Sequence, residues 1–83
     1  MRVNVQQPDG GNAIFNTVTD QFVEFDSPIR EYSETYDWQD ALYMAIGAEM
    51  RISDSVQMAI DKGLVSKARC EIILKEMEES FDA

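Results

Sequence analysis

Residues 3–18, with the sequence VNVQQPDGGNAIFNTV, decide the fold because they join two strand patterns through a strong turn. Valines alternate with polar residues at the start of this stretch, which is the period of a half-buried strand. The turn PDGGN at 8–12 follows, where glycine and asparagine tolerate a positive φ and aspartate bonds the local backbone. A β-branched segment comes next. The pattern predicts an antiparallel hairpin of residues 3–7 and 13–18.

Beyond the hairpin, the chain offers a third strand. Residues 19–21 resemble a second turn, and residues 22–25 then predict a strand with Val23 and Phe25 on one face. One long, bent second strand is the alternative. Because a lone hairpin is marginally stable in water, other elements must cover its apolar face.

The second half of the chain carries helical patterns. Apolar residues at intervals of three and four predict a helix from residue 38 to about residue 50, with Asp37 as its cap. Ser53 and Ser66 are the expected caps of a short helix over 54–62 and of a last helix. Gly63 lies where a left-handed residue is expected to end the short helix. The side chains expected to be buried are Trp38, Ala41, Leu42, Ala45, Ile46, Val56, Ala59, Ile60, Cys70, Ile73, Leu74, Met77 and Phe81.

Residues 27–36 connect the two halves. Ser27 and Pro28 suit the first positions of a helix, so both a short helix and an irregular acidic connector remain open here. The sequence predicts an α+β fold for one domain over 1–83, with a β region over 1–26 and a helical region over 37–83. In this fold, an N-terminal antiparallel hairpin or three-stranded meander packs against two or three C-terminal helices.

Composition argues against an enzyme. The chain has no histidine, so Ser–His and Cys–His nucleophile pairs are excluded, and Cys70 is expected to be a buried structural thiol. Zinc-ligand and calcium-loop patterns are absent, and the glycines do not form a phosphate loop. We therefore expect no catalytic, cofactor or metal site. No apolar run is long enough to span a membrane, and the N-terminus lacks a signal-peptide pattern, so the expected location is the cytoplasm.

Negative charge is the feature that points to a function. The net charge is −9, and residues 20–40 carry seven carboxylates against Arg30 alone. Within this segment, Glu31, Glu34, Asp37 and Asp40 fall at every third position. Like charges at that spacing repel each other on a helix, which favours a functional reason for the array. The expected partner-binding residues are Asp20, Glu24, Asp26, Glu31, Tyr32, Glu34, Tyr36, Asp37 and Asp40. The alternative is that acidity only maintains solubility.

The acidic array resembles, in charge and spacing, the surfaces of proteins that mimic a nucleic-acid backbone. In size and charge, the chain is similar to phage anti-defence proteins, including anti-CRISPR proteins and antirestriction DNA mimics. The resemblance implies a non-enzymatic inhibitor that docks on the basic, nucleic-acid-binding face of a target protein. Such an inhibitor would bind neither nucleic acid nor a membrane directly, and self-association stays open.

Two other functions compete with this one. Residues 57–66 resemble the helix-turn-helix of small DNA-binding proteins, with Ala59, Gly63 and Ser66 in the matching roles and one extra residue in the turn. This resemblance implies a transcriptional regulator or antitoxin that uses residues 57–75 on DNA. An ordinary helical corner needs the same glycine and cap, and a pI near 4.2 lacks the basic footprint of DNA binding. The third function is that of a subunit in a larger assembly.

Overall fold

The predicted hairpin forms the middle of the sheet. In a computed structural model, which describes residues 1–82 and side chains through Ser80, β1 (Arg2–Gln6) pairs antiparallel with β2 (Asn12–Asn16). The register sets Val3 opposite Phe15 and Val5 opposite Ala13. These four side chains are fully buried, as alternation along the two strands requires. The hairpin prediction is confirmed.

A separate third strand, β3 (Gln21–Glu24), pairs antiparallel with β2, so the alternative of one long second strand is wrong. The predicted face of this strand is also wrong, because Phe22 is buried whereas Val23 is 44% exposed. The reason is the register. Phe22 lies opposite Phe15, and opposite residues of an antiparallel pair point to the same face. Phe25 is buried beyond the end of the strand, where Asp26 turns the chain with a φ of 55°.

The fourth strand was not predicted. β4 (Thr35–Tyr36) pairs in parallel with β1 and completes a mixed sheet of order β3-β2-β1-β4 in the part of the chain that the structure describes. Residues 27–34 between β3 and β4 form an irregular connector, so the short-helix alternative is wrong. A two-residue strand is too short to show a period of its own, and its partner lies about thirty positions away.

Three helices follow within residues 1–82: α1 (Trp38–Glu49), α2 (Asp54–Asp61) and α3 (Lys67–Asp82). Each begins where a cap was predicted. The side chain of Asp37 accepts a hydrogen bond from Gln39 N, that of Ser53 from Val56 N, and that of Ser66 from Arg69 N. Gly63 adopts a φ of 76° after α2, the left-handed conformation expected there.

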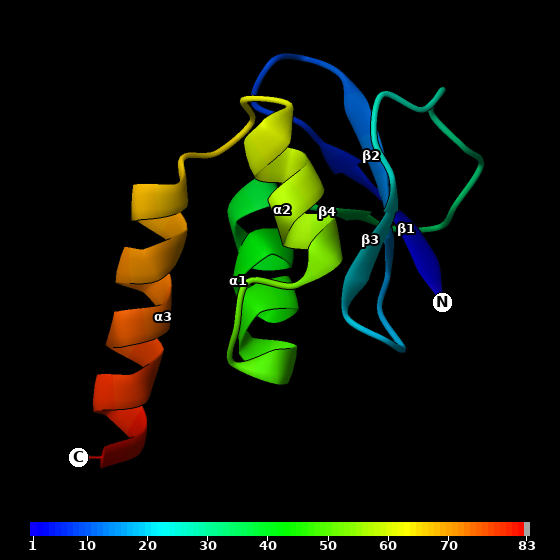
Figure 1. Cartoon of the computed structure of the whole chain (residues 1–83). Helices are drawn as coiled ribbons and strands as arrows, with labels where there is room; N and C mark the ends of the chain where they lie inside the picture. The colour runs from blue at the N-terminus through cyan, green and yellow to red at the C-terminus, as the bar shows by residue number, and fades with distance from the viewer. Residues whose placement is uncertain (83) are drawn as a thin grey trace.

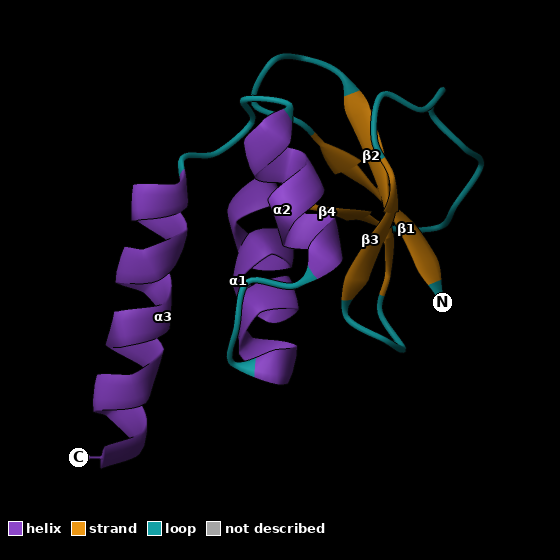
Figure 2. Cartoon of the chain, viewed as in Figure 1, coloured by secondary structure: helices purple, strands orange, loops and turns teal. Residues whose placement is uncertain are grey.

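The helices cover one face of the sheet, and α1 and α2 stand between the sheet and α3 (Figures 1 and 2). α1 and α2 contact the strands, whereas α3 packs mainly on α1. The predicted stripes are largely confirmed, although Trp38, Ile60, Leu74 and Met77 pack at the edge of the core and are only partly buried. The expectation for Phe81 lies outside the side chains that the structure describes.

The connector partly covers the opposite face of the sheet. Asn4, which points away from the helices, donates a hydrogen bond from Nδ2 to Arg30 O at 2.7 Å and accepts one from Arg30 N at 3.1 Å. Ile14, on the same outer face, is buried. The connector is therefore anchored to the sheet through backbone groups and leaves its charged side chains free to point outward. In the described part of the chain, none of the helices has the length and apolar character needed to cross a membrane.

Candidate interaction surface

Asp26 was expected on the partner-binding surface, and its exposed carboxylate is bonded to other residues of the fold. Gln7 Nε2 donates to Asp26 Oδ1 at 2.8 Å, and Lys62 Nζ lies 2.9 Å from Asp26 Oδ2. The hydrogen bonds from Gln7 and Lys62 lower the pKa of Asp26 below its usual range, since both favour the charged form. The side chain therefore ties the start of the connector to the hairpin turn and to the end of α2.

Three more of the expected partner-binding residues have structural roles. Asp37 caps α1 through its Oδ2, 3.0 Å from Gln39 N. The ring of Tyr36, in β4, packs against Phe15 with 6.5 Å between the ring centroids. Asp20 lies in the turn before β3 with a φ of 54°, a conformation that aspartate tolerates better than most residues. Each of these three residues therefore has a role within the fold, and its contact with a partner stays a prediction.

The predicted helical array of carboxylates does not exist. Glu31 and Glu34 lie in the irregular connector, and only Asp40 of the four residues at every third position lies on a helix. Because the connector is irregular, the spacing of three residues does not place Glu31 and Glu34 on neighbouring turns of a helix. The repulsion invoked for a helix is therefore mostly absent, and the connector carries its charge at low cost.

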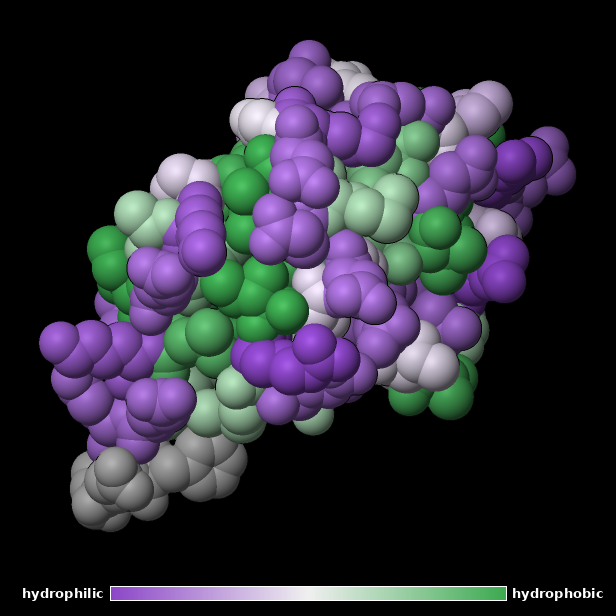
Figure 3. All heavy atoms as spheres, viewed as in Figure 1, coloured by the Kyte–Doolittle hydropathy of each residue, from purple (hydrophilic) through white to green (hydrophobic). Residues whose placement is uncertain are grey.

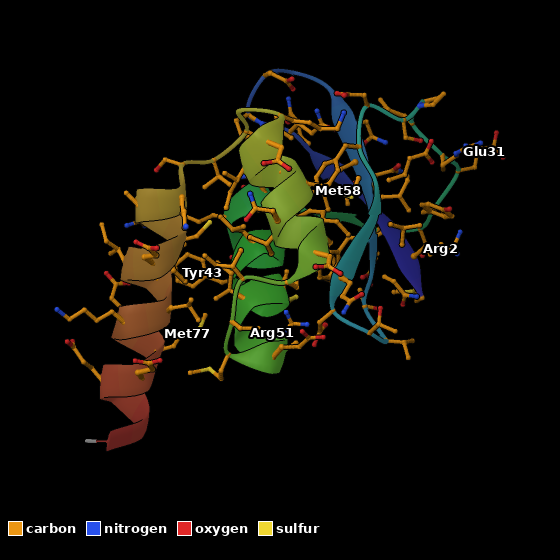
Figure 4. The ribbon with its side chains drawn as sticks, viewed as in Figure 1. Arg2, Glu31, Tyr43, Arg51, Met58 and Met77 are labelled. Carbon is orange, nitrogen blue, oxygen red and sulfur yellow. The ribbon has the colours of Figure 1, made fainter. Side chains whose placement is uncertain are left out.

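The carboxylates that remain free are fewer than the sequence suggested. Glu31 and Glu34 are exposed on the connector, and neither forms an ion pair with any residue that the structure describes. Half-buried Tyr32 lies between them, while Glu24 stands 4.0 Å from the guanidinium of Arg30. Figure 4 places Glu31 on the side of the sheet away from the helices. We call residues 28–34 with these side chains the acidic connector.

Asp40 does not belong to this surface. It is exposed on α1, which packs on the other face of the sheet. The nine expected partner-binding residues therefore do not gather on one face. The structure brings together the members that lie on the connector and separates them from Asp40.

Two hollows are of interest in the part of the surface that the structure describes. One, of about 570 Å³, lies where the connector crosses the sheet, and its lining combines polar residues such as Asn4 and Asn12 with the apolar side chains of Pro28 and Ile29. The other, of about 340 Å³, lies between the start of α1 and α3. Apolar side chains also come to the surface between α3 and the other two helices, with hydrophilic ones around them (Figure 3). Neither hollow could be predicted from the sequence, because each joins segments that are distant along the chain.

Chemistry at these places is limited. Among the described residues, no group of three potential metal ligands comes together. Cys70 is fully buried on α3, and burial raises the pKa of its thiol, which disfavours the reactive thiolate. Sequence reasoning missed Gln7, and it considered Arg69 only as part of the possible DNA-binding segment 57–75. Gln7 is a polar residue buried beside the hairpin turn, and Arg69 lies at the edge of the smaller hollow.

No protein-family model, curated protein or solved structure matches this chain. What can be said of its function rests on its own residues.

Proposed function

We propose that this chain is a non-enzymatic interaction protein whose acidic connector docks on a basic surface of another protein. The observation that carries the proposal is that Glu31 and Glu34 are exposed, without an internal cation, on either side of Tyr32. The other carboxylates at this end of the molecule, Glu24 and Asp26, have basic neighbours in the fold. Glu31 and Glu34 therefore present negative charge on the segment that lies on the side of the sheet away from the helices.

Electrostatic attraction would raise the association rate of such a contact and would favour partners with a basic surface. The Debye length in cells is about 8 Å, so a partner senses the local connector more than the net charge of −9. Tyrosine is a common anchor in interfaces, and Tyr32 offers a ring between two charges. The preferred target is a nucleic-acid-binding protein, whose basic face would otherwise hold phosphates. An inhibitor of the phage anti-defence kind, such as an anti-CRISPR protein or a DNA mimic, would act in this way.

A charge-reversal experiment with a matched control tests the proposal. The double variant Glu31→Lys/Glu34→Lys reverses the connector's charge, and Glu78→Lys/Glu79→Lys makes the same change in net charge on α3. Each protein is immobilised and exposed to nuclease-treated lysate, and bound proteins are quantified at low and raised salt. The wild type and the α3 variant should capture a basic protein whose binding weakens as salt is raised, and the connector variant should not capture it. Duplex DNA should compete with the wild type for binding to that protein. Equal loss with both variants would mean that net charge alone drives the capture, and the proposal would fail.

The regulator alternative stays a prediction. Its predicted corner is present, with Gly63 in the left-handed conformation and Ser66 capping α3. A helix-turn-helix, however, packs its two helices against each other, whereas α3 packs mainly on α1. A sequence-specific gel shift on duplex DNA that Lys67→Glu/Arg69→Glu abolishes, with the connector reversal silent, would favour this alternative.

The third alternative, a subunit of a larger assembly, has one observation in its favour. Val18 and Ile29 are large apolar side chains and are about four-fifths exposed. Both belong to loops, the β2–β3 turn and the connector, not to a helix or strand. Analytical ultracentrifugation of the wild type and of Val18→Ser/Ile29→Ser would show whether they mediate self-association.

A further inference from the structure

The groove between the start of α1 and α3 has the features of a small-ligand site, separate from the acidic connector. Its floor contains Leu42 and Ile73, which belong to the core, and its walls include Trp38 and Val65, which are half-buried. Its volume of about 340 Å³ lies at the small end of the usual range for ligand pockets. The groove can therefore hold one compact apolar group.

Arg69 supplies the polar end of this groove. The chain has 16 acidic side chains against seven basic ones, yet Arg69 forms no ion pair with any carboxylate that the structure describes. Its Nη2 instead donates a hydrogen bond to Tyr43 Oη at 3.2 Å. Figure 4 shows Tyr43 reaching from α1 into the space that faces α3. The phenol orients the guanidinium at the edge of the groove and leaves its positive charge uncompensated.

We propose that this groove binds a small apolar carboxylate, with its aromatic or branched body against Trp38 and Leu42 and its carboxylate on Arg69. A guanidinium is suited to this because it offers paired N–H donors to a planar carboxylate. Asp37 also lines the groove, but its Oδ2 already caps α1. The orientation of the ligand follows, since its negative end is attracted to Arg69 and repelled by Asp37.

The net charge of −9 opposes an anion only weakly at this place. Among the residues that line the groove, Asp37 is the one carboxylate, and charges more than about 8 Å away are largely screened at physiological salt. A ligand of about eleven heavy atoms is expected to bind weakly, with a dissociation constant on the order of 1 mM.

The test uses 3-phenylpropionate as the probe and 3-phenylpropionamide as its neutral counterpart. Trp38 is the only tryptophan in the chain and lines the groove, so its fluorescence reports occupancy directly. Sodium chloride at matched concentration controls for ionic strength. The variant Arg69→Gln removes the charge, and Lys75→Gln removes an exposed positive charge from the same helix outside the groove. Unfolding midpoints establish that both variants fold.

The acid should produce a saturable change in Trp38 emission and bind about tenfold or more tightly than the amide, as expected for loss of a charge-assisted hydrogen bond. Arg69→Gln should weaken binding of the acid to the level of the amide and leave binding of the amide unchanged. Lys75→Gln should change the affinity for neither ligand. Equal binding of acid and amide to the wild type would overturn the proposal. So would an equal effect of the two variants, or the lack of a saturable response up to about 10 mM.

Discussion

Gln7 and Asp26 hold each other through two hydrogen bonds of opposite direction. Gln7 Nε2 donates to Asp26 Oδ1 at 2.8 Å, and Asp26 N donates to Gln7 Oε1 at 2.7 Å, although 19 positions separate the two residues. Gln7 is 2% exposed, and Asp26 adopts a φ of 55°. The pair fixes the point at which the chain leaves the sheet and begins the acidic connector, so the geometry of the proposed interaction surface depends on it.

Gln7→Ala should destabilise the fold markedly. The change leaves the part-buried backbone N–H of Asp26 without its acceptor and removes a donor to its carboxylate, which costs about 1–3 kcal/mol. Chemical denaturation measures the free energy of unfolding. Gln6→Ala, at the exposed neighbouring position, is the control and should change stability by less than about 0.5 kcal/mol. Similar effects at both positions would show that the reciprocal bonds contribute little.

Asp26 should contribute to an acid-dependent loss of stability. The pKa of Asp26 is lowered in the folded state by Gln7 and Lys62, so its contribution to stability is fully present above the unfolded value of about 3.9 and is lost as the pH falls below that value and through the lower pKa of the folded state. Asp26→Asn should therefore lower the thermal midpoint at pH 7. It should also reduce the difference in thermal midpoint between pH 7 and about pH 3. Glu71→Gln, which removes an exposed carboxylate from α3, should leave that difference close to that of the wild type. A full acid-dependent loss in Asp26→Asn would contradict the assignment.

Two glycines should respond to alanine in opposite directions. A Cβ at Gly11 would lie 2.7 Å from Gln7 Nε2, so Gly11→Ala must displace the amide that bonds Asp26 and should destabilise the fold. A Cβ at Gly47, inside α1, would lie 3.5 Å from Met77 Sδ, an ordinary contact. Gly47→Ala should therefore stabilise the protein by about 0.5–1 kcal/mol through helix propensity. Differential scanning calorimetry of both variants measures the sign of each change in stability. Destabilisation by Gly47→Ala would mean that α1 and α3 pack more tightly than described.

Adjacent isoleucines on α3 provide a matched test of the buried stripe. Ile73 is 0% exposed, whereas Ile72, about 100° further round the helix, is 48% exposed. Ile73→Ala should cost about 2–5 kcal/mol through lost burial and a cavity, whereas Ile72→Ala should cost less than about 1 kcal/mol. The half-buried Leu74 should fall between them. Urea titrations of the three variants measure the free energies of unfolding that decide the ranking. An equal cost at the two isoleucines would mean that the packing of α3 on α1 is described wrongly.

Cys70 should be inert in the folded protein. Its side chain is 0% exposed, and burial raises the pKa of the thiol, so both access and the thiolate fraction are low. A chromogenic disulfide reagent should react slowly under native conditions and completely within the same period after denaturation. Rapid native labelling would indicate that α3 detaches readily from α1.

The elements with a clear local signal were predicted well. Alternating valines and the glycine turn specified the central hairpin, and the caps Asp37, Ser53 and Ser66 marked where each helix begins. The elements without such a signal were missed. β4 is two residues long, and the inward face of β3 depended on a register that no local pattern states.

The candidate surface was predicted only in part. The excess of carboxylates in residues 20–40 is a property of the sequence, but which of them are free is not. Asp26 and Asp37 resembled Glu31 in the sequence, yet the first bonds Gln7 and Lys62 and the second caps α1. The position of Arg69 at the edge of the groove could not be predicted, because the groove forms only when α3 docks on α1.

The sequence by itself determined the charge, the α+β class and the limits of the helices, because these follow from composition and from patterns within a few residues. Only the tertiary structure decided that Gln7 reaches Asp26, that β4 joins β1, and that Arg69 faces Tyr43. Each of these joins residues 19 or more positions apart. Such contacts form where the packing of whole elements brings two side chains or strands within reach, and that packing depends on the entire core at once.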